Sequence, residues 1–251
     1  MVTADLNGKA VLVTGASSGI GLAAVELFGG CGAKVALNHL PDDSRGPEQL
    51  ERLRGAGLDV VGAPGDVSKP GVAESMVERA AADLGRLDIL VNNAGTSNTV
   101  DPVPFENLDA MTEEFWNVVL ATNLVGPFRC AHAARPHLAK TRGAIVNTAS
   151  VAGLGTRGSS IAYGASKAGL INLTRTLGIA LGPEVRVNAV APGLVDTPWT
   201  EPWPEERKRQ YIGATMMKRI VKPQDIASAM LFLAVHPAIS GQTLAVDCGR
   251  I

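Results

Sequence analysis

Tyr163 and Lys167 are four positions apart in the segment Ile-Ala-Tyr-Gly-Ala-Ser-Lys, which spans residues 161–167. Four residues make about one helical turn, so a helix here would place the phenol and the ammonium on one face. A tyrosine with a pKa near 10 is a weak base at neutral pH, and a nearby cation favours the phenolate and lowers that pKa. The pair therefore predicts a general acid/base, although chance placement on an amphipathic helix gives the same spacing.

A glycine-rich turn lies near the start of the chain. Residues 14–21 read Thr-Gly-Ala-Ser-Ser-Gly-Ile-Gly, directly after an apolar run and before a helical pattern. Glycines permit a tight turn, and a helix N-terminus presents free N–H groups and a positive dipole end. The segment predicts a cradle for the pyrophosphate of a dinucleotide. Because its spacing differs from the general Gly-x-Gly-x-x-Gly pattern, a turn that serves only packing stays open.

Composition excludes several classes of partner. The 251 residues carry 23 Lys plus Arg against 24 Asp plus Glu, so neither nucleic acid nor an anionic membrane is an expected partner. The cysteines at 31, 130 and 248 lack metal-ligand spacing, and we expect reduced thiols and no metal site. Residues 1–9 lack the apolar core of a signal peptide, and no apolar run has membrane-spanning length. A soluble, cytoplasmic protein is expected.

Short β-branched runs alternate with longer helical patterns. Nearly continuous apolar character predicts strands at 10–14, 34–38, 59–62, 89–92, 144–149, 185–191 and 243–246. Helical patterns cover 19–28, 48–56, 72–84, 112–138, 162–181 and 224–234, and Pro127 and Pro136 should kink or end the longest. This alternation predicts an α/β protein, a doubly wound three-layer Rossmann fold with a mainly seven-stranded parallel sheet flanked by helices. Without repeats or linkers, residues 1–251 should form a single domain.

The stretch 193–214 breaks this alternation. It contains three prolines and three large aromatic residues, namely Pro198, Pro202, Pro204, Trp199, Trp203 and Tyr211. Such a long connection predicts a substrate-binding loop or lid. A surface loop whose tryptophans only fill its own underside is the alternative.

Further motifs follow the predicted strands in order. They are Asp66-Val67 after the third, Asn92-Asn93-Ala94-Gly95 after the fourth, Asn123 in the long helix, Ser150 thirteen positions before Tyr163, and Pro192-Gly193-x-Val195-x-Thr197 after the sixth. Together with the glycine turn and the Tyr-x-x-x-Lys pair, they resemble the short-chain dehydrogenase/reductase family, whose common form has about the length of this chain. The resemblance covers essentially the whole chain.

The resemblance implies an NAD(P)-dependent oxidoreductase, a short-chain alcohol dehydrogenase or carbonyl reductase acting on CH–OH donors. Tyr163 would be the general acid/base, and Lys167 would bind the nicotinamide ribose and depress the tyrosine pKa. Ser150 would stabilise the carbonyl oxygen, and Asn123 would hold a water that links Lys167 to solvent. The implied cofactor contacts are Gly15, Ser17, Ser18, Gly19, Ile20, Gly21, Asn38, His39, Asp66, Val67, Asn93, Ala94, Gly95, Tyr163, Lys167, Pro192, Gly193, Val195 and Thr197.

The choice between NAD and NADP depends on the end of the second strand. A carboxylate there binds the ribose hydroxyls of NAD and repels a 2′-phosphate, but alignment with relatives places His39 at that position. Arg45 could reach a phosphate, although Asp42 and Asp43 dilute its positive field. The glycine turn also lacks the basic residue of many NADP-dependent relatives. The sequence favours NADP, weakly.

Several functions stay open. The tryptophans of the 193–214 loop favour an apolar or ring-bearing small-molecule substrate over a bulky anion, while Arg157 could meet a carboxylate or phosphate. Reduction of 3-oxoacyl thioesters, oxidation of sugars, polyols or cyclic alcohols, and a non-catalytic dinucleotide-binding scaffold remain alternatives. The short interval between Tyr163 and Lys167 disfavours the carbon–carbon double-bond reduction of enoyl reductases. The resemblance also implies a homotetramer, or a dimer, formed through residues 112–138, 162–181 and the last strand.

Overall fold

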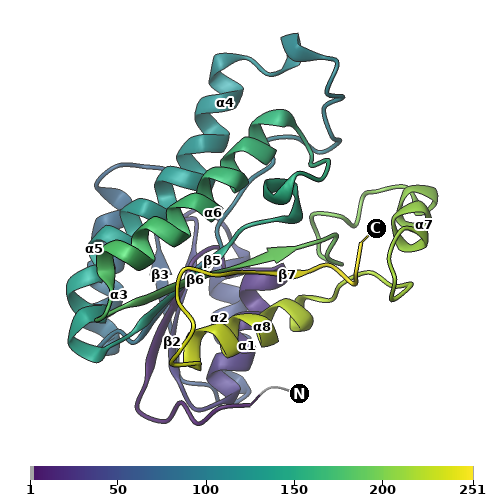
Figure 1. The fold of residues 1–251 in the computed structure, drawn as a ribbon. Coiled ribbons are helices and arrows are strands. Elements are labelled where there is room, and N and C mark those ends of the chain that lie inside the picture. The colour runs from purple at the N-terminus through teal and green to yellow at the C-terminus, as the bar shows by residue number, and fades with distance from the viewer. Residues whose placement is uncertain (1–2, 251) are drawn as a thin grey trace.

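Seven parallel strands form the central sheet in the order β3-β2-β1-β4-β5-β6-β7 (Figure 1), and the computed structural model describes residues 3–250. Residues 1, 2 and 251 of the expected domain lie outside that range. The strands are β1 (Ala10–Val13), β2 (Lys34–His39), β3 (Val60–Pro64), β4 (Ile89–Asn92), β5 (Ala144–Thr148), β6 (Arg186–Pro192) and β7 (Thr243–Val246). The chain reverses its direction of winding between β1 and β4, which confirms the predicted doubly wound Rossmann fold.

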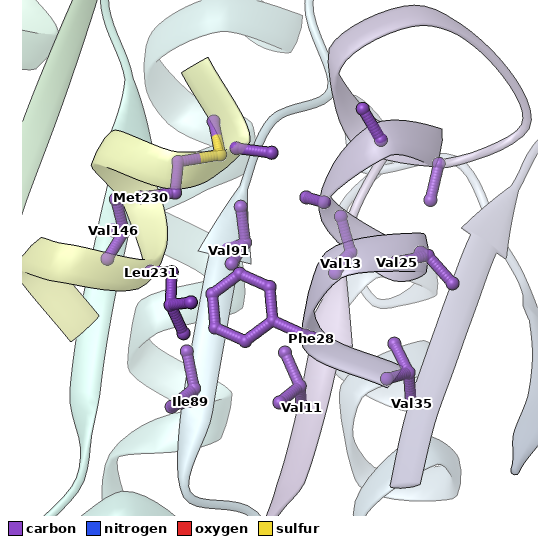
Figure 2. Packing of buried hydrophobic residues seen from close by; sticks show 14 of the residues in the cluster. Val11, Val13, Val25, Phe28, Val35, Ile89, Val91, Val146, Met230 and Leu231 are labelled. Atoms are coloured by element: carbon purple, nitrogen blue, oxygen red, sulfur yellow. The ribbon is translucent and has the colours of Figure 1, made fainter. Parts of the chain in front are cut away.

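Helices cover both faces of the sheet. On one face lie α1 (Gly19–Gly30), α2 (Arg45–Gly55) and α8 (Pro223–Val235); on the other lie α3 (Val72–Leu84), α4 (Glu113–Leu120), α5 (Gly126–Thr141) and α6 (Ile161–Leu181). Successive strand residues alternate between the two cores, so Val11 and Val13 face one layer and Leu12 the other. In Figure 2 the Phe28 ring lies between α1, α8 and the strands, against Leu231 and Ile89.

The helix predicted at 112–138 is present, and it contains a π-helical turn, η2 (Ala121–Val125), between α4 and α5. Asn123 lies in this π-helical turn. Pro127 lies in the first turn of α5, where its missing N–H breaks no helical bond. Pro136 does not end the helix, which continues to Thr141. Because Pro136 is exposed, the carbonyl one turn before it can bond to water.

The other differences lie at element ends and in the loop. Helix α2 begins at Arg45, three residues earlier than predicted, because Pro47 is tolerated in a first turn. The 193–214 stretch contains a short helix that the sequence did not predict, α7 (Glu205–Gly213). No residue of α7 is buried, so it carries no apolar periodicity for a sequence pattern to show. Within residues 3–250, no helix combines the length and apolar character needed to cross a bilayer.

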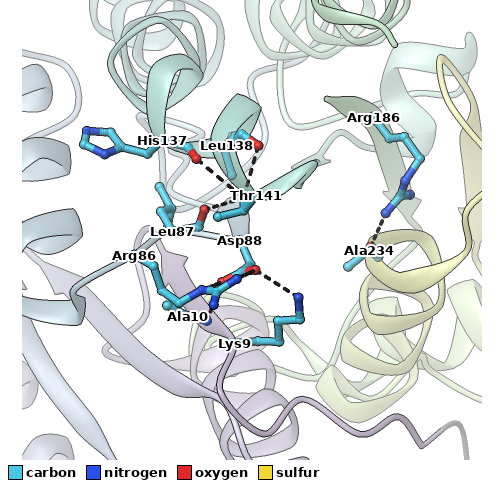
Figure 3. A network of polar contacts seen from close by, with 10 residues as sticks. All are labelled: Lys9, Ala10, Arg86, Leu87, Asp88, His137, Leu138, Thr141, Arg186 and Ala234. Atoms are coloured by element: carbon cyan, nitrogen blue, oxygen red, sulfur yellow. Dashed lines mark hydrogen bonds and ion pairs between the residues drawn. The ribbon is translucent and has the colours of Figure 1, made fainter. Parts of the chain in front are cut away.

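A polar network ties the amino ends of the strands together (Figure 3). The buried Asp88 carboxylate accepts hydrogen bonds from Arg86 at 2.7 Å, from the Ala10 N–H at 3.0 Å and from Lys9 at 3.2 Å. Burial raises the pKa of Asp88, but these hydrogen bonds outweigh it and hold that pKa below its usual value. This network lies at the edge of the sheet opposite to the carboxyl ends of the strands.

Candidate active site

A pocket of about 1070 Å³ opens at the carboxyl ends of the strands, where the winding direction reverses. This volume is at the upper end for small-molecule sites and leaves room for a dinucleotide with a small substrate. The predicted site residues that line it are Gly15, Ser17, Ser18, Gly19, Ile20, Asn38, His39, Asp66, Val67, Asn93, Ala94, Gly95, Ser150, Tyr163, Lys167, Pro192, Gly193, Val195 and Thr197. Gly21 and Asn123 are buried and do not line it.

The glycine turn joins β1 to α1 in a conformation that requires glycine. Gly15 and Gly19 have φ values of +59° and +55°, in the left-handed region. A Cβ at Gly21 would lie 2.4 Å from the Gly15 carbonyl oxygen, so this position is closed to any side chain. The Ser18 hydroxyl does not cap α1, which leaves the first-turn N–H groups for a ligand anion. The turn therefore fits the pyrophosphate of a dinucleotide.

Two asparagines hold this turn from opposite sides. Asn38 Oδ1 accepts from the Gly15 N–H at 3.0 Å, and its Nδ2 donates to the carbonyls of Ala63 in β3 and of Gly65 just after it. Asn93 Nδ2 donates to the carbonyls of Thr14 and Gly15 at 3.1 and 2.9 Å. The amide group of Asn38 is thus occupied by the protein, so this predicted cofactor contact fixes the shape of the turn.

The corner of the pocket beside β2 carries a hydrogen-bonded ion pair. Arg45 donates two hydrogen bonds to Asp43, at 2.8 and 3.0 Å, and the Ser17 hydroxyl donates to the same carboxylate at 2.7 Å. The Arg45 hydrogen bonds, opposed by burial and helped by Ser17, lower the pKa of Asp43 to about 2. His39 is buried, with Nδ1 2.8 Å from the Leu40 carbonyl oxygen. The Asp43 carboxylate therefore lies in this corner, four residues after His39, where a carboxylate is usual in NAD-dependent relatives.

Helix α6 presents the Tyr-x-x-x-Lys pair to the pocket. Ser160 caps the helix by accepting from the Tyr163 N–H at 3.0 Å. Lys167 is buried, and its Nζ donates to the Thr148 carbonyl at the end of β5 at 2.7 Å. Nζ lies 5.7 Å from the centre of the Tyr163 ring. The structure thus brings the two residues together on one face of one helix, as the spacing predicts.

Burial shifts the ionisation of both members of this pair. Burial raises the pKa of Tyr163 above its ordinary value, and the neighbouring Ser150 hydroxyl only partly opposes it. Burial also lowers the pKa of Lys167 to about 8. In the protein alone the pKa of Tyr163 is therefore raised, because desolvation by burial dominates. The lowering of this pKa by Lys167 in the cofactor-bound site stays a prediction.

Ser150 follows β5 and begins the short 3₁₀ helix η3 (Val151–Leu154). Its hydroxyl oxygen accepts from the Ala152 N–H at 3.2 Å, so it is a turn cap. Accepting one bond leaves its O–H free to donate into the pocket. The η3 turn packs closely on α6, because a Cβ at Gly153 would lie 2.6 Å from the Lys167 carbonyl carbon.

Asn123 lies behind the pocket in the π-helical turn. Its Oδ1 accepts from the Thr96 N–H at 2.8 Å, while Nδ2 donates to the Thr96 carbonyl at 2.8 Å and to the Ser166 hydroxyl at 3.1 Å. Ser166 in turn donates to the Tyr163 carbonyl at 2.7 Å. The Asn123 side chain therefore ties the loop after β4 to α6, and its amide group is fully used by the protein.

The 193–214 loop contacts the pair directly. The Trp199 ring meets the Tyr163 ring edge to face, with centroids 6.3 Å apart, and its Nε1 donates to Ser97 at 3.1 Å. Tyr211 accepts from the Leu194 N–H at 2.7 Å, which fixes α7 to the segment after β6. The loop thus closes one side of the pocket instead of only covering itself.

Sequence reasoning missed several residues of this site. Ser160 carries a recognisable signal, since a serine directly before a helical pattern predicts an N-cap. Thr148 carries none, because it acts through its backbone carbonyl. Asp43 is expected only as a charge near Arg45, and its hydrogen bond with Ser17 cannot be seen in the sequence. Only the folded chain brings them to the pocket.

Comparisons with known proteins found relatives that match nearly the whole chain. The family model described as "Enoyl-(Acyl carrier protein) reductase" matches residues 15–250. A ketoacyl reductase of the granaticin polyketide synthase of Streptomyces violaceoruber is 39% identical over 99% of this chain and 98% of its own. A 3-oxoacyl-[acyl-carrier-protein] reductase of Thermotoga maritima is 37% identical over 98% and 99%, respectively. The crystal structure of a short-chain dehydrogenase/reductase from Burkholderia xenovorans superposes with a TM-score of 0.88 and 32% identity, over 96% of this chain and 97% of that one.

Proposed function

This chain belongs to the short-chain dehydrogenase/reductase family, and on that premise we propose that Tyr163 is the general acid/base of a reversible ketone/secondary-alcohol oxidoreduction. The protein is an NAD(P)-dependent oxidoreductase. A bound nicotinamide supplies the hydride chemistry. The observation that carries the proposal is the buried Lys167 ammonium held beside the Tyr163 ring, at the end of a pocket that begins in a glycine cradle.

Tyr163 gives its proton to the carbonyl oxygen during reduction and removes it during oxidation. Its raised pKa keeps the phenol protonated at neutral pH in the protein alone, which suits the acid role. Lys167, held by the Thr148 carbonyl, is in place to bind the nicotinamide ribose and to favour the phenolate during oxidation. Tyr163 thus carries the transferred proton, and the charge of Lys167 sets how readily Tyr163 releases it.

Ser150 donates a hydrogen bond to the substrate oxygen. Its hydroxyl lies beside the Tyr163 phenol and its O–H is not used by the turn that it caps. Two donors on one oxygen stabilise the negative charge that develops there during hydride transfer. Asn123 completes the set by a relay water, which we assign to its backbone carbonyl in the π-helical turn because its side chain is fully bonded.

We propose NADP as the preferred cofactor, with a modest margin over NAD. The supporting features are the buried His39 where a carboxylate would repel a 2′-phosphate, and the Arg45 guanidinium on the pocket wall. Asp43 neutralises part of that guanidinium, which is why the margin is modest. The other cofactor contacts predicted from the sequence are proposed to bind the dinucleotide directly. Asn38 and Gly21 are proposed to act only by shaping the glycine turn.

Among carbonyl substrates, a 3-oxoacyl thioester is the second candidate, favoured by the names of the two relatives described above. The family model carries the name of an enoyl reductase, but the interval between Tyr163 and Lys167 favours carbonyl chemistry. Residues 1–251 are proposed to form one catalytic domain with a substrate-binding loop at 193–214. A cytoplasmic location stays a prediction.

A homotetramer, or a dimer, is proposed from the apolar residues that helices and the last strand leave exposed. They are Val118, Val125, Phe128 and Ile179 on the α4–α6 side, and Phe232, Val235 and Leu244 on the α8–β7 side. Light scattering of the purified protein tests this, and a monomer at micromolar concentration contradicts it.

The proposed activity is tested by the oxidation of NADPH and NADH with a panel of ketones, and by the reverse reaction with the corresponding alcohols. Turnover of at least one ketone with a nicotinamide cofactor is expected. Binding of the dinucleotide without turnover of any ketone, 3-oxoacyl thioester or alcohol would favour the non-catalytic scaffold.

A further inference from the structure

Three arginines line the substrate end of the pocket, and each lies on an aromatic ring. The guanidinium carbon of Arg207 is 3.7 Å from the centre of the Trp203 ring, and that of Arg250 is 4.7 Å from the Tyr211 ring. Arg157 lies 5.1 Å from the Phe105 ring. Stacking of this kind holds a planar guanidinium in one orientation and leaves its edge N–H groups to bind an anion.

The three arginines differ in whether their guanidinium groups form an ion pair with a carboxylate of the protein. Arg157 is largely exposed and lies 3.4 Å from Glu106, so its charge is partly neutralised in solvent. For Arg207 and Arg250, no residue between 3 and 250 forms an ion pair or a side-chain hydrogen bond with the guanidinium. Both are half-buried on the pocket wall. Among residues 3–250, two oriented cations therefore line the pocket without a counter-ion in contact.

Acidic side chains near this wall are engaged elsewhere. On α7, Glu205 pairs with Lys208 and Glu206 with Arg209. Burial lowers the pKa of Arg207, and the charge of Asp101, which lies outside the pocket lining, only partly opposes this. An arginine stays charged at neutral pH in spite of such a shift. The substrate end of the pocket is therefore positively charged.

The ring beneath Arg250 is itself fixed. The Tyr211 hydroxyl accepts from the Leu194 N–H at 2.7 Å, which ties this ring to the segment that follows β6. The same pocket has apolar lining: Trp199 contacts the Tyr163 ring edge to face, and Val103 and Val118 add further apolar surface. The pocket that holds Tyr163 therefore offers both an apolar surface and the two cations.

We propose that Arg207 and Arg250 bind an anionic group of the substrate, a carboxylate or a phosphate, while its apolar body lies against Trp199. This inference rests on the proposed function and defines the substrate class of the same site. It departs from the expectation of a substrate without a bulky anion, because the charged group binds at the wall and only the apolar part reaches Tyr163.

Two matched pairs of ketones test the proposal with the full-length protein. Cyclohexanone and 4-oxocyclohexanecarboxylate differ only by a carboxylate. The 3-oxobutanoyl thioesters of coenzyme A and of N-acetylcysteamine differ by the phosphate-bearing part of the carrier. We expect kcat/KM to be higher for the anionic member of at least one pair, by about ten- to a hundredfold, the range of one or two hydrogen bonds to a charged group. The pair that shows the preference identifies the source of the anion.

Arg207→Met removes the charge and keeps most of the apolar length. It should abolish most of that preference by raising KM for the anionic member, with little change for the neutral one, and Arg207→Lys should restore part of it. Arg209→Met, on the exposed side of the same helix, is the matched control and should change neither member. NADPH binding, followed by fluorescence, verifies that each variant is folded.

Turnover of neutral ketones with no anionic preference in either pair would overturn the inference and leave the proposed function intact. An equal loss for both members in Arg207→Met would also overturn it. Turnover of other panel ketones but of neither anionic member would also overturn the inference alone. If nothing in the panel or in either pair turns over with either cofactor, the proposed function fails and the inference fails with it.

Discussion

The Lys167 ammonium lies 5.7 Å from the centre of the Tyr163 ring, one turn away on the same helix. Its distance from the phenol is set by a third group, because Nζ donates to the Thr148 carbonyl at the last residue of β5. The sheet therefore fixes the cation, and the helix fixes the phenol relative to it. A ligand that enters the pocket meets a pair that is already positioned.

Tyr163→Phe should lower kcat by about two to four orders of magnitude, the usual contribution of a general acid/base. The ring keeps its contact with Trp199, so dinucleotide binding should stay near the wild-type level. Steady-state kinetics and cofactor fluorescence measure the two quantities. Near-normal turnover by this variant would remove Tyr163 from the mechanism.

Lys167→Met should abolish most turnover and yet make the protein more stable at neutral pH. The folded pKa of Lys167, about 8, lies below the ordinary lysine value of 10.5, so burial of the ammonium destabilises the fold at pH 7 by at most about 3 kcal/mol. Folding releases a proton between these two pH values, and wild-type stability therefore rises, relative to the variant, as pH increases through that window. Urea unfolding at pH 7 and pH 10 measures the gap.

The control for that experiment is Lys69→Met, since Lys69 is exposed. Its stability should follow the wild type at both pH values. A gap between Lys167→Met and wild type that stays constant from pH 7 to pH 10 would mean that the ammonium is not desolvated as the structure indicates.

Ser150→Ala should lower kcat by about two to three orders of magnitude, as expected when one donor to a developing oxyanion is lost. The effect should fall on kcat more than on KM, because the hydrogen bond strengthens as charge develops. Ser159→Ala is the matched control: Ser159 lines the same pocket, but its hydroxyl is buried, so its loss should affect kcat little. Equal kinetics for the two variants would reduce Ser150 to a turn cap.

Asp43→Asn should raise kcat/KM for NADP relative to NAD, because it removes a carboxylate with a pKa of about 2 from the corner that holds Ser17 and Arg45. Arg45→Ala should lower the same ratio, by about tenfold if one charge-assisted hydrogen bond is lost. Asp42→Asn, one position away, controls for net charge. If Asp42→Asn and Asp43→Asn shift the ratio equally, the contacts of Asp43 are irrelevant to cofactor choice.

Asp88→Asn should destabilise the protein by about 1–3 kcal/mol at neutral pH, because the Ala10 N–H and Arg86 lose a charged acceptor. The folded pKa of Asp88 is lowered, so this stabilisation is fully present above the unfolded value near 4 and is lost as pH falls through the folded value. Urea titrations at neutral and acid pH should show the gap narrowing only in acid. An unchanged kcat is also expected, and a large loss of kcat would contradict the separation of this network from the site.

The fold was predictable because parallel strands that are buried on both faces leave a plain signature. Val11, Leu12 and Val13 are apolar whichever layer they face, and helical patterns separate such runs along the chain. The π-helical turn at Asn123 was not predictable, since residues 112–138 have a helical pattern throughout and the interruption depends on bonds to Thr96 and Ser166. Helix α7 was not predicted because it buries no residue and therefore shows no apolar periodicity.

The sequence predicts which residues form the candidate site, but it predicts their pKa values and hydrogen-bond partners less well. Spacing places Tyr163 and Lys167 on one face, but it does not report how much water surrounds them, and desolvation sets their pKa values in the protein alone. Likewise, the side-chain amide of Asn38 is already hydrogen-bonded to the Gly15 N–H and to the Ala63 carbonyl. Such uses of a side chain depend on strand register, which a single sequence does not show.

Gly153 lies so close to the backbone of Lys167 that the turn behind Ser150 and helix α6 must move as one piece. We therefore expect exchange of residues 198–214 for those of a relative to change which substrates are accepted, while Tyr163 and Ser150 keep their spacing. The architecture is modular in this respect, and laboratory evolution of new selectivity should begin in that segment.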